Sequence, residues 1–191
     1  VDTISNRSLY STTNKEFVRF IEQLWEHSLS CAYASQIISE VLKIKSTDDI
    51  FTMGLFHDIG KLVLLQVFGE LEIKGQLGEE AGRIEMFKDL DTYHCKFGAA
   101  LLKKWKFSNG YIQIAMRHDN LEEADPNPKA LLLVHFSNLL VKSMGYDIGE
   151  QTEIDVEGAK SAHLLELNST MIAEVKDQVK GHMEEMGGIF N

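Results

Sequence analysis

The sequence predicts an all-α fold, and three of its features carry that prediction. Residue types that favour helices, namely Leu, Ala, Glu, Lys and Met, are plentiful along the chain. Only two prolines occur, both between Asp125 and Pro128, so long stretches lack the residue that most often interrupts a helix. Apolar residues recur at the three- and four-residue spacing of a helix face, first over residues 17–24.

The first half of the chain divides into three expected helices. The first follows N-cap candidates at Ser11–Asn14, and its apolar face continues to Leu42. Residues 46–49 can cap the second helix. We expect a break at Gly60 and then a short buried helix over residues 62–68. A strand is the alternative for that run, because short apolar runs fit both structures.

The middle of the chain is expected to hold a loop and then three helices. Residues 69–82 contain four glycines and many charges, which favours a loop. Apolar spacing then predicts helices near residues 81–90, 92–105 and 109–118, the last with Ser108 as its cap.

The last third begins with a proline-containing turn that starts a helix. Pro128 is expected near the first position of that helix, and Gly145 is placed like a C-terminal glycine cap. Two further helices are expected near residues 157–165 and 169–186, with Asn168 or Ser169 capping the second and Gly187–Gly188 ending it. With no internal repeat, the 191 residues predict a single domain, residues 1–191.

Composition limits the classes of function. The chain carries 29 acidic and 19 basic residues, a formal charge of −10, which argues against a nucleic-acid-binding protein. No apolar run approaches the roughly 18 residues needed to cross a bilayer, and no signal peptide is visible. The two cysteines, Cys31 and Cys95, make neither a disulfide framework nor a paired-cysteine metal motif. We therefore expect a cytoplasmic protein that binds neither nucleic acid nor membrane.

Five places combine a possible ligand side chain with an apolar helix. They are His27, His57–Asp58, His94, His118–Asp119, and His135 with Asn138. The stretch LFHDIGK puts a histidine, an aspartate and a lysine among apolar neighbours, where unpaired charge costs several kcal/mol. Such residues could hold a metal ion, or they could form a metal-free hydrogen-bonded network that fixes helix packing.

The order and spacing of these motifs resemble the HD superfamily of metal-dependent phosphohydrolases, and most closely its HDOD branch of bacterial signalling proteins. The motifs are LWEHSLSCA, GLFHDIGKLVL, YHCKFGAALLKKW, IQIAMRHDN and LLLVHFSNLLV, which lie between residues 24 and 141, and the resemblance extends over roughly residues 16–186. The resemblance implies a compact multi-helix HD-type bundle. Members of the family usually have further helices ahead of the first histidine motif, and this chain as given does not show them.

The resemblance also implies roles for individual residues. His27, His57, Asp58 and the late-helix Asn138 would hold a divalent metal, for which Mn, Fe, Ni, Zn and Mg are candidates. In an active enzyme Asp58 and Lys61 would be catalytic, with Lys61 holding the substrate phosphate. The remaining family positions would bind a second metal or the phosphate, and they correspond to His94, His118 and Asp119.

Two departures from the enzyme pattern favour a regulatory function. The catalytic branches have an aspartate where this chain has Asn138, so one anionic ligand is missing. The branch that cleaves cyclic di-GMP has a second histidine in place of Asp119 and a Gly-Tyr-Pro signature beyond it, and both are absent here. We therefore expect a signal-transduction module that binds a nucleotide-like ligand or a partner signalling protein, in an oligomeric state that the sequence does not fix. The alternatives are a metal-dependent phosphohydrolase acting on a nucleotide or other phosphate ester, and a helical scaffold without a ligand.

Overall fold

A computed structural model describes residues 15–45, 48–76, 80–121, 128–148 and 153–190, and within these ranges it contains helices and no strand. The all-α prediction is therefore confirmed. The helices are α1 (Lys15–Val41), α2 (Ile50–Phe56), α3 (Ile59–Ile73), α4 (Glu80–Lys104), α5 (Asn109–Arg117), α6 (Lys129–Ser143), α7 (Lys160–Leu164) and α8 (Ser169–Phe190).

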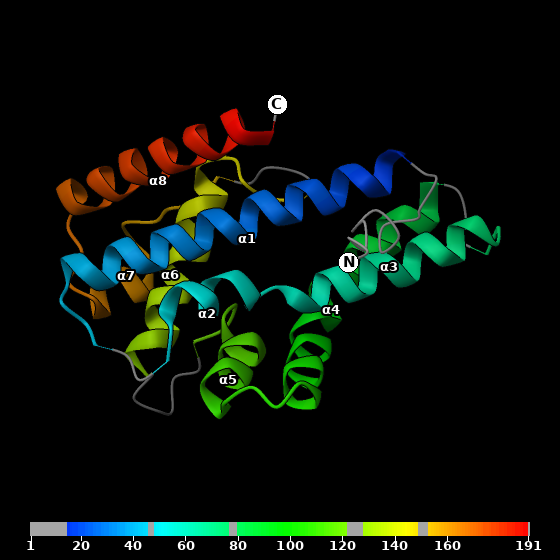
Figure 1. The fold of residues 1–191 in the computed structure, drawn as a ribbon, viewed down its shortest axis with the longest axis horizontal. Helices are drawn as coiled ribbons and strands as arrows, with labels where there is room; N and C mark the ends of the chain where they lie inside the picture. Colours follow the sequence, from blue (N-terminus) through cyan, green and yellow to red (C-terminus); the bar gives the residue numbers. More distant parts are fainter. Residues whose placement is uncertain (1–14, 46–47, 77–79, 122–127, 149–152, 191) are drawn as a thin grey trace, which may run out of the picture.

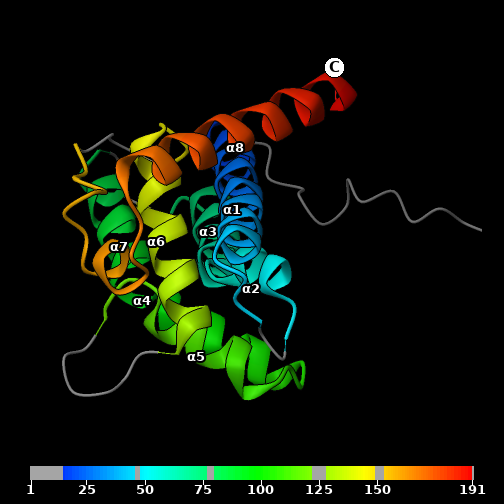
Figure 2. The same cartoon turned by 90° about the vertical axis from the view of Figure 1, so that its left-hand side faces the viewer.

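The long helix α1 is the centre of the arrangement. It packs against α2, α3, α6 and α8, while α3 packs on α4 and α4 on α5. Figure 1 shows α2 and α3 following the same long direction as α1, with α8 along the opposite side of α1. Figure 2, turned by 90°, shows that α8 lies over α1 and α6. It also shows that α5 lies at the opposite end of the molecule from α8. Helices distant in sequence therefore meet around α1.

The apolar core consists of three clusters carried by these helices. The largest joins α1, α6 and α8, and includes Ile38, Phe136 and Val179, all fully buried. A second joins α1, α3 and α4, and a third joins α4 and α5. Burial of such side chains contributes about 1.5–3 kcal/mol each before the entropy cost of folding. The helices that carry these clusters also carry the buried polar residues described below.

Two glycines let backbones approach closely at helix crossings. A Cβ atom on Gly60 of α3 would lie 1.9 Å from the backbone oxygen of His94 on α4. A Cβ atom on Gly54 of α2 would lie 2.8 Å from Ala32 Cα on α1. Neither crossing accepts a side chain, because both obstructing atoms belong to the backbone. Gly60 is thus a contact position inside α3 and not the break that the sequence predicted.

The chain turns between α2 and α3 at His57–Asp58, three residues earlier than expected. α3 then continues through Gly69 to Ile73, so much of the predicted loop is helical. The two helices expected near residues 81–90 and 92–105 are a single helix, α4. α8 also continues past Gly187–Gly188 to Phe190. Gly69, Gly187 and Gly188 are tolerated inside helices, since the cost of glycine, about 1 kcal/mol, is small beside tertiary packing.

The predicted helix caps are partly confirmed. Asp49 accepts a hydrogen bond from the backbone N–H of Phe51, and Asn168 from that of Met171. Gly145 has a φ of 92°, as expected for a glycine after a helix end. Ser108 occupies the N-cap position but its hydroxyl donates to Asp48 instead. The expected caps at residues 11–14 lie outside the described residues.

One stretch, Ile50–Ile73, is by length and mean hydropathy (1.4) apolar enough to cross a membrane. The expectation that no run approaches this length was therefore wrong. The stretch is two helices, α2 and α3, separated at His57–Asp58, and it packs on α1 and α4. Its apolar character is that of a core element, since buried helices and membrane spans share this composition.

Candidate metal centre

The four histidines and two aspartates of the predicted site come together although five helices supply them. α1 contributes His27, and the α2–α3 junction contributes His57 and Asp58. α4 contributes His94, and the end of α5 contributes His118 and Asp119. Except for Asp119, each of these residues is at most 1% exposed. The structure thus assembles a buried polar centre from the motifs that the sequence singled out.

The break between α2 and α3 lets two neighbouring residues face one point. His57 is the C-cap residue of α2, and Asp58 the N-cap residue of α3 with φ −102° and ψ 14°. This bridge conformation is sparsely populated and is common at functional sites. On a continuous helix the two side chains would point about 100° apart. The Asp58 carboxylate does not cap α3 and is directed at the histidines instead.

All four histidine rings converge on the Asp58 carboxylate. Its Oδ2 lies 3.4 Å from Nε2 of His27 and 3.5 Å from Nε2 of His57. Its Oδ1 lies 3.1 Å from Nε2 of His118 and 3.3 Å from Nε2 of His94. Asp58 therefore stands between two groups of donors, one at each oxygen.

The hydrogen bonds of the rings fix which nitrogen faces the centre. Nδ1 of each histidine lies near a backbone carbonyl oxygen, at 2.7 Å for His27, 2.6 Å for His57, 2.7 Å for His94 and 3.2 Å for His118. A carbonyl oxygen only accepts, so Nδ1 carries the hydrogen. In the neutral ring Nε2 then presents a lone pair to the centre. This is the tautomer arrangement found in metal-ligating histidines, whose other nitrogen donates to a carbonyl or carboxylate.

The donors at Asp58 Oδ2 fit a metal ion. The Nε2 atoms of His27 and His57 are 3.2 Å apart, and each lies 3.4–3.5 Å from Oδ2. Ligands at bond lengths of about 2.0–2.2 Å in tetrahedral geometry are roughly 3.3–3.6 Å apart, so the three atoms lie close to one face of such a polyhedron. Apart from an ion pair of Oδ2 with Lys61 at 2.7 Å, neither oxygen of Asp58 has a hydrogen-bond partner among the described residues.

A second group of donors faces Asp58 Oδ1. Nε2 of His94 lies 3.4 Å from Nε2 of His118 and 3.0 Å from Oδ2 of Asp119. Cys95 Sγ lies 3.3 Å from the same His94 atom. The four ligand atoms all lie within 4.8 Å of one another. Cys95 was not among the ligands predicted from the sequence, which has no paired-cysteine metal motif, although its position beside His94 was an available signal.

Charges around the centre shift the acidity of its members. Burial alone would raise the pKa of Asp58, but the Lys61 ammonium and the histidines hold it well below its usual range. Burial lowers the pKa of His57 well below its usual value, more than Asp58 raises it. The net pKa shift of His94 is upward. Burial alone would lower its pKa, but hydrogen bonds to Asp119 and Cys95 raise it to about 10. Without a metal, His57 is thus neutral and His94 is protonated at pH 7.

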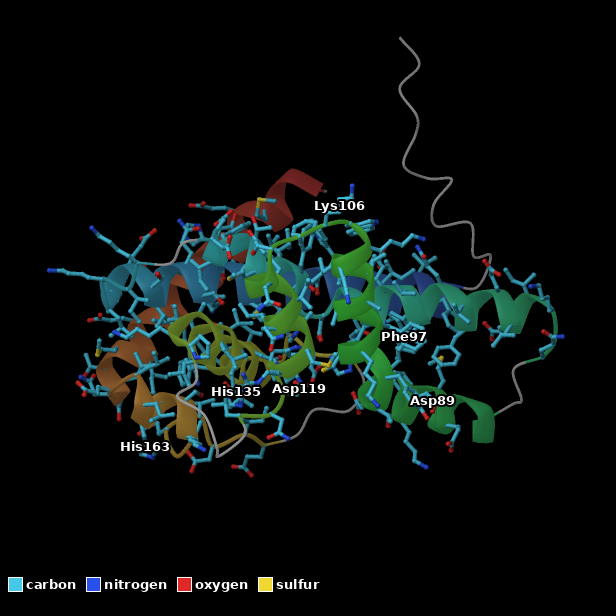
Figure 3. The ribbon with its side chains drawn as sticks, turned by 90° about the horizontal axis from the view of Figure 1, so that it is seen from below. Asp89, Phe97, Lys106, Asp119, His135 and His163 are labelled. Atoms are coloured by element: carbon cyan, nitrogen blue, oxygen red, sulfur yellow. The ribbon has the colours of Figure 1, made fainter. Side chains whose placement is uncertain are left out.

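Asn138 contacts this centre through Asp119. Its Nδ2 donates a hydrogen bond of 3.0 Å to Oδ1 of Asp119, while its own Oδ1 is buried and has no hydrogen-bond partner in the part of the chain that the structure describes. Its role as a ligand stays a prediction. His135 does not join the group; its Nδ1 lies 2.9 Å from the Ser161 hydroxyl. Figure 3 shows the labelled Asp119 and His135 near each other, with His163 on the far side of His135 from Asp119.

Solvent reaches this centre at Asp119 and Cys95. Lys61 and Asn138 are 5% and 2% exposed, and the donors at Asp58 Oδ2 are buried as well. The Asp119 side chain is 38% exposed, and Cys95 is of intermediate burial. An ion can be enclosed by the inner donors, whereas a larger molecule meets the site first at Asp119 and Cys95.

The comparisons with known proteins agree with this geometry. A family model for the HDOD domain matches residues 3–121. The chain belongs to the HDOD family. All four histidines, Asp58 and Asp119 lie inside the matched residues, whereas Asn138 lies beyond them. Membership indicates a regulatory or HD-like module.

One relative adds little about activity. An uncharacterized protein of Treponema pallidum (strain Nichols) is 27% identical to this HDOD protein over 146 residues. These cover 72% of the chain and 27% of the relative, so the chain spans about a quarter of that protein's length. No solved structure matches the chain.

Proposed function

We propose that this HDOD protein is a cytoplasmic signal-transduction module of bacterial type, in which residues 1–191 form one domain. Its His/Asp centre binds divalent metal and serves ligand or partner binding, not catalysis. The carrying observation is the convergence of four Nε2 atoms on Asp58, with every Nδ1 directed at a backbone carbonyl. Without a cation, ring lone pairs and carboxylate oxygens would face one another. A divalent ion, or protons on the rings, satisfies them.

Burial supports a binding role over turnover. The donors at Asp58 Oδ2 are enclosed by their helices, so a phosphate ester reaches them only if helices move apart. Lys61, which would hold a substrate phosphate in an active enzyme, is 5% exposed and paired with Asp58 at 2.7 Å. Asn138 adds no anionic ligand. A nucleotide-like ligand or partner protein would therefore act at the exposed edge around Asp119.

The second candidate is a metal-dependent phosphohydrolase. The observation that favours it is the three-donor set of His27, His57 and Asp58. Catalytic metal sites commonly have three protein ligands and one position for water or substrate, whereas structural sites are closed by four. A metal at such a site supplies Lewis acidity toward a phosphoryl oxygen. Asp58 and Lys61 would orient the phosphate.

Elemental analysis of the purified full chain tests the proposal. The protein is analysed as isolated and after loading with Mn, Fe, Ni or Zn, beside His57→Ala and the control His163→Ala. His163 is exposed and lies outside the cluster, so His163→Ala should match the wild type. We expect up to one ion per donor set in the wild type and loss of at least the His27–His57–Asp58 ion in His57→Ala.

The same samples separate the alternatives. Each metal-loaded protein is assayed with phosphomonoester and phosphodiester substrates. Hydrolysis by the wild type that disappears in His57→Ala would show an enzyme and contradict the regulatory proposal. Absence of bound metal under every loading would contradict metal binding and leave the cluster as a helix-packing network.

A further inference from the structure

Cys95 occupies a position that the predicted ligand sets leave out. It follows His94 on α4, and its Sγ lies 3.3 Å from Nε2 of His94 and 3.9 Å from Oδ2 of Asp119. It is a free thiol of intermediate burial, at the side of the centre that solvent reaches. The other cysteine, Cys31, is fully buried on α1 near the Val134 carbonyl oxygen. Only Cys95 is thus placed to react with a solute at the centre.

The distances around Cys95 describe a four-donor polyhedron. With zinc bond lengths of about 2.3 Å to sulfur and 2.0–2.2 Å to nitrogen and oxygen, a tetrahedron has edges of roughly 3.3–3.7 Å. Five of the six edges among these donors are 3.0, 3.3, 3.4, 3.5 and 3.9 Å, and the sixth, between Cys95 and His118, is within 4.8 Å. The shortest of these distances is below the ideal edge length and the longest is above it. The donors are His94, Cys95, His118 and Asp119.

The surroundings orient Asp119 for such a site. Its Oδ1 accepts a hydrogen bond from Asn138 at 3.0 Å and lies 3.9 Å from the Lys142 ammonium. Its Oδ2 faces His94, His118 and Cys95 instead. Asn138 and Lys142 thus act as positioning residues, the usual role of groups that hydrogen-bond a ligating carboxylate.

A second observation independently points to a cation here. Oδ1 of Asp58 is fully buried and lies 3.1 and 3.3 Å from Nε2 of His118 and His94, so it requires either a proton on one of these rings or a cation beside it. Buried carboxylate oxygens are nearly always satisfied, because an unsatisfied one loses its hydration without compensation. A cation held by the four donors would lie beside this oxygen.

We infer that Cys95 is a ligand, and that with His94, His118 and Asp119 it forms a zinc site separate from the donors at His27 and His57. This inference rests on the metal-binding part of the proposed function and names the ion. A thiolate with two imidazoles and one carboxylate is a tetrahedral, borderline-soft donor set that suits zinc. Magnesium and manganese prefer oxygen ligands. The Cys95 side chain would therefore make this site of the HDOD centre prefer zinc over magnesium and manganese.

Cobalt substitution tests the inference spectroscopically. The full chain is stripped with a chelator and titrated with Co²⁺, beside Cys95→Ala, Cys95→Ser and the control Cys31→Ala. A thiolate bound to Co²⁺ gives a near-ultraviolet charge-transfer band that histidine and carboxylate ligands do not give. We expect the band in the wild type and Cys31→Ala and its complete loss in both Cys95 variants. In competition assays, the zinc affinity of the site formed by His94, Cys95, His118 and Asp119 should fall about tenfold or more in both Cys95 variants.

A second measurement uses only the wild-type protein, so it does not depend on folding of the variants. A thiol-alkylating reagent is applied to the chelator-stripped and the zinc-loaded chain, and the modified cysteine is located by peptide mass mapping. We expect Cys95 to be modified in the stripped protein and protected by stoichiometric zinc but not by magnesium. Cys31, which is 0% exposed, is the internal control and should stay unmodified in both samples.

The outcomes distinguish this inference from the proposed function. Cobalt bound without a charge-transfer band, together with unprotected Cys95, would overturn the thiolate ligand and leave metal binding by the histidines intact. Cys95 would then be a hydrogen-bonding neighbour of His94. Failure to bind cobalt or zinc at all would overturn the metal centre and this inference with it.

Discussion

Gly60→Ala tests whether the α3–α4 contact sets the geometry of the centre. Gly60 lies two residues after Asp58, and its backbone faces the backbone of His94 and Gly98. A Cβ atom at Gly60 would lie 1.9 Å from the His94 carbonyl oxygen. An ordinary carbon–oxygen contact is about 3.4 Å, so the helices must separate by about 1.5 Å. The obstructing atom belongs to the backbone and cannot rotate away.

The size of the effect follows from that displacement. Overpacking of a tight contact costs about 1–3 kcal/mol, and a backbone obstruction belongs at the upper end. For a chain of this length, about 3 kcal/mol corresponds to a fall in Tm of roughly 6–12 °C. Metal sites tolerate changes of about 0.2 Å in their distances. Separation of Asp58 from His94, whose atoms are 3.3 Å apart, should therefore also weaken metal binding.

Thermal unfolding with and without added zinc measures both effects. The matched control is Gly181→Ala on α8, where a Cβ atom meets nothing within 4 Å. That substitution should leave metal binding unchanged and raise stability by up to about 1 kcal/mol, because alanine favours helices. A Tm of Gly60→Ala within 1 °C of the wild type, with unchanged metal content, would refute the claim that this crossing is closed to a side chain.

Two further predictions concern charge in the centre. Asn138→Asp replaces the 3.0 Å hydrogen bond to Asp119 with two facing carboxylates, so the metal-free protein should lose about 1–3 kcal/mol of stability and recover it on metal binding. The Tm of Asn138→Asp and of the wild type, with and without metal, measures this loss of stability, and an unchanged Tm of the metal-free variant would contradict the prediction. A gain of phosphatase activity in Asn138→Asp would show that the natural site is a degenerate enzyme site. Because the pKa of His94 is raised to about 10, the metal-free folded state binds an extra proton above pH 6.5. The stability that this proton contributes is therefore full below pH 6.5, and the free energy of unfolding falls by about 1.4 kcal/mol per pH unit between pH 6.5 and pH 10. Denaturant unfolding at pH 7, 8 and 9 should show this slope in the wild type and a flatter one in His94→Gln, and a wild-type free energy that rises with pH would contradict it.

The family, fold class and most helix positions could be predicted from the sequence. Apolar residues repeat with helical spacing because one face of each helix is buried, so α1, α5, α6 and α8 were visible locally. The four histidines and two aspartates were likewise identifiable, because buried polar residues are unusual in apolar helices.

The sequence could not predict where helices break or join. Gly60 resembled a break because glycine costs helix stability, yet its absent side chain is what allows α3 and α4 to touch. The chain turns instead at His57–Asp58, where Asp58 is a residue type common at N-caps, although its carboxylate does not cap α3.

By itself, the sequence determined that this is a helical HDOD protein with a clustered set of histidines and aspartates. Only the tertiary structure decided that Asp58 lies between two donor groups, that Cys95 belongs to one of them, and that Asn138 contacts Asp119. The physical reason is that ligand geometry depends on distances of a few ångströms between side chains from different helices. Those distances are set by backbone contacts such as Gly60 against His94, which involve residues far apart in the sequence.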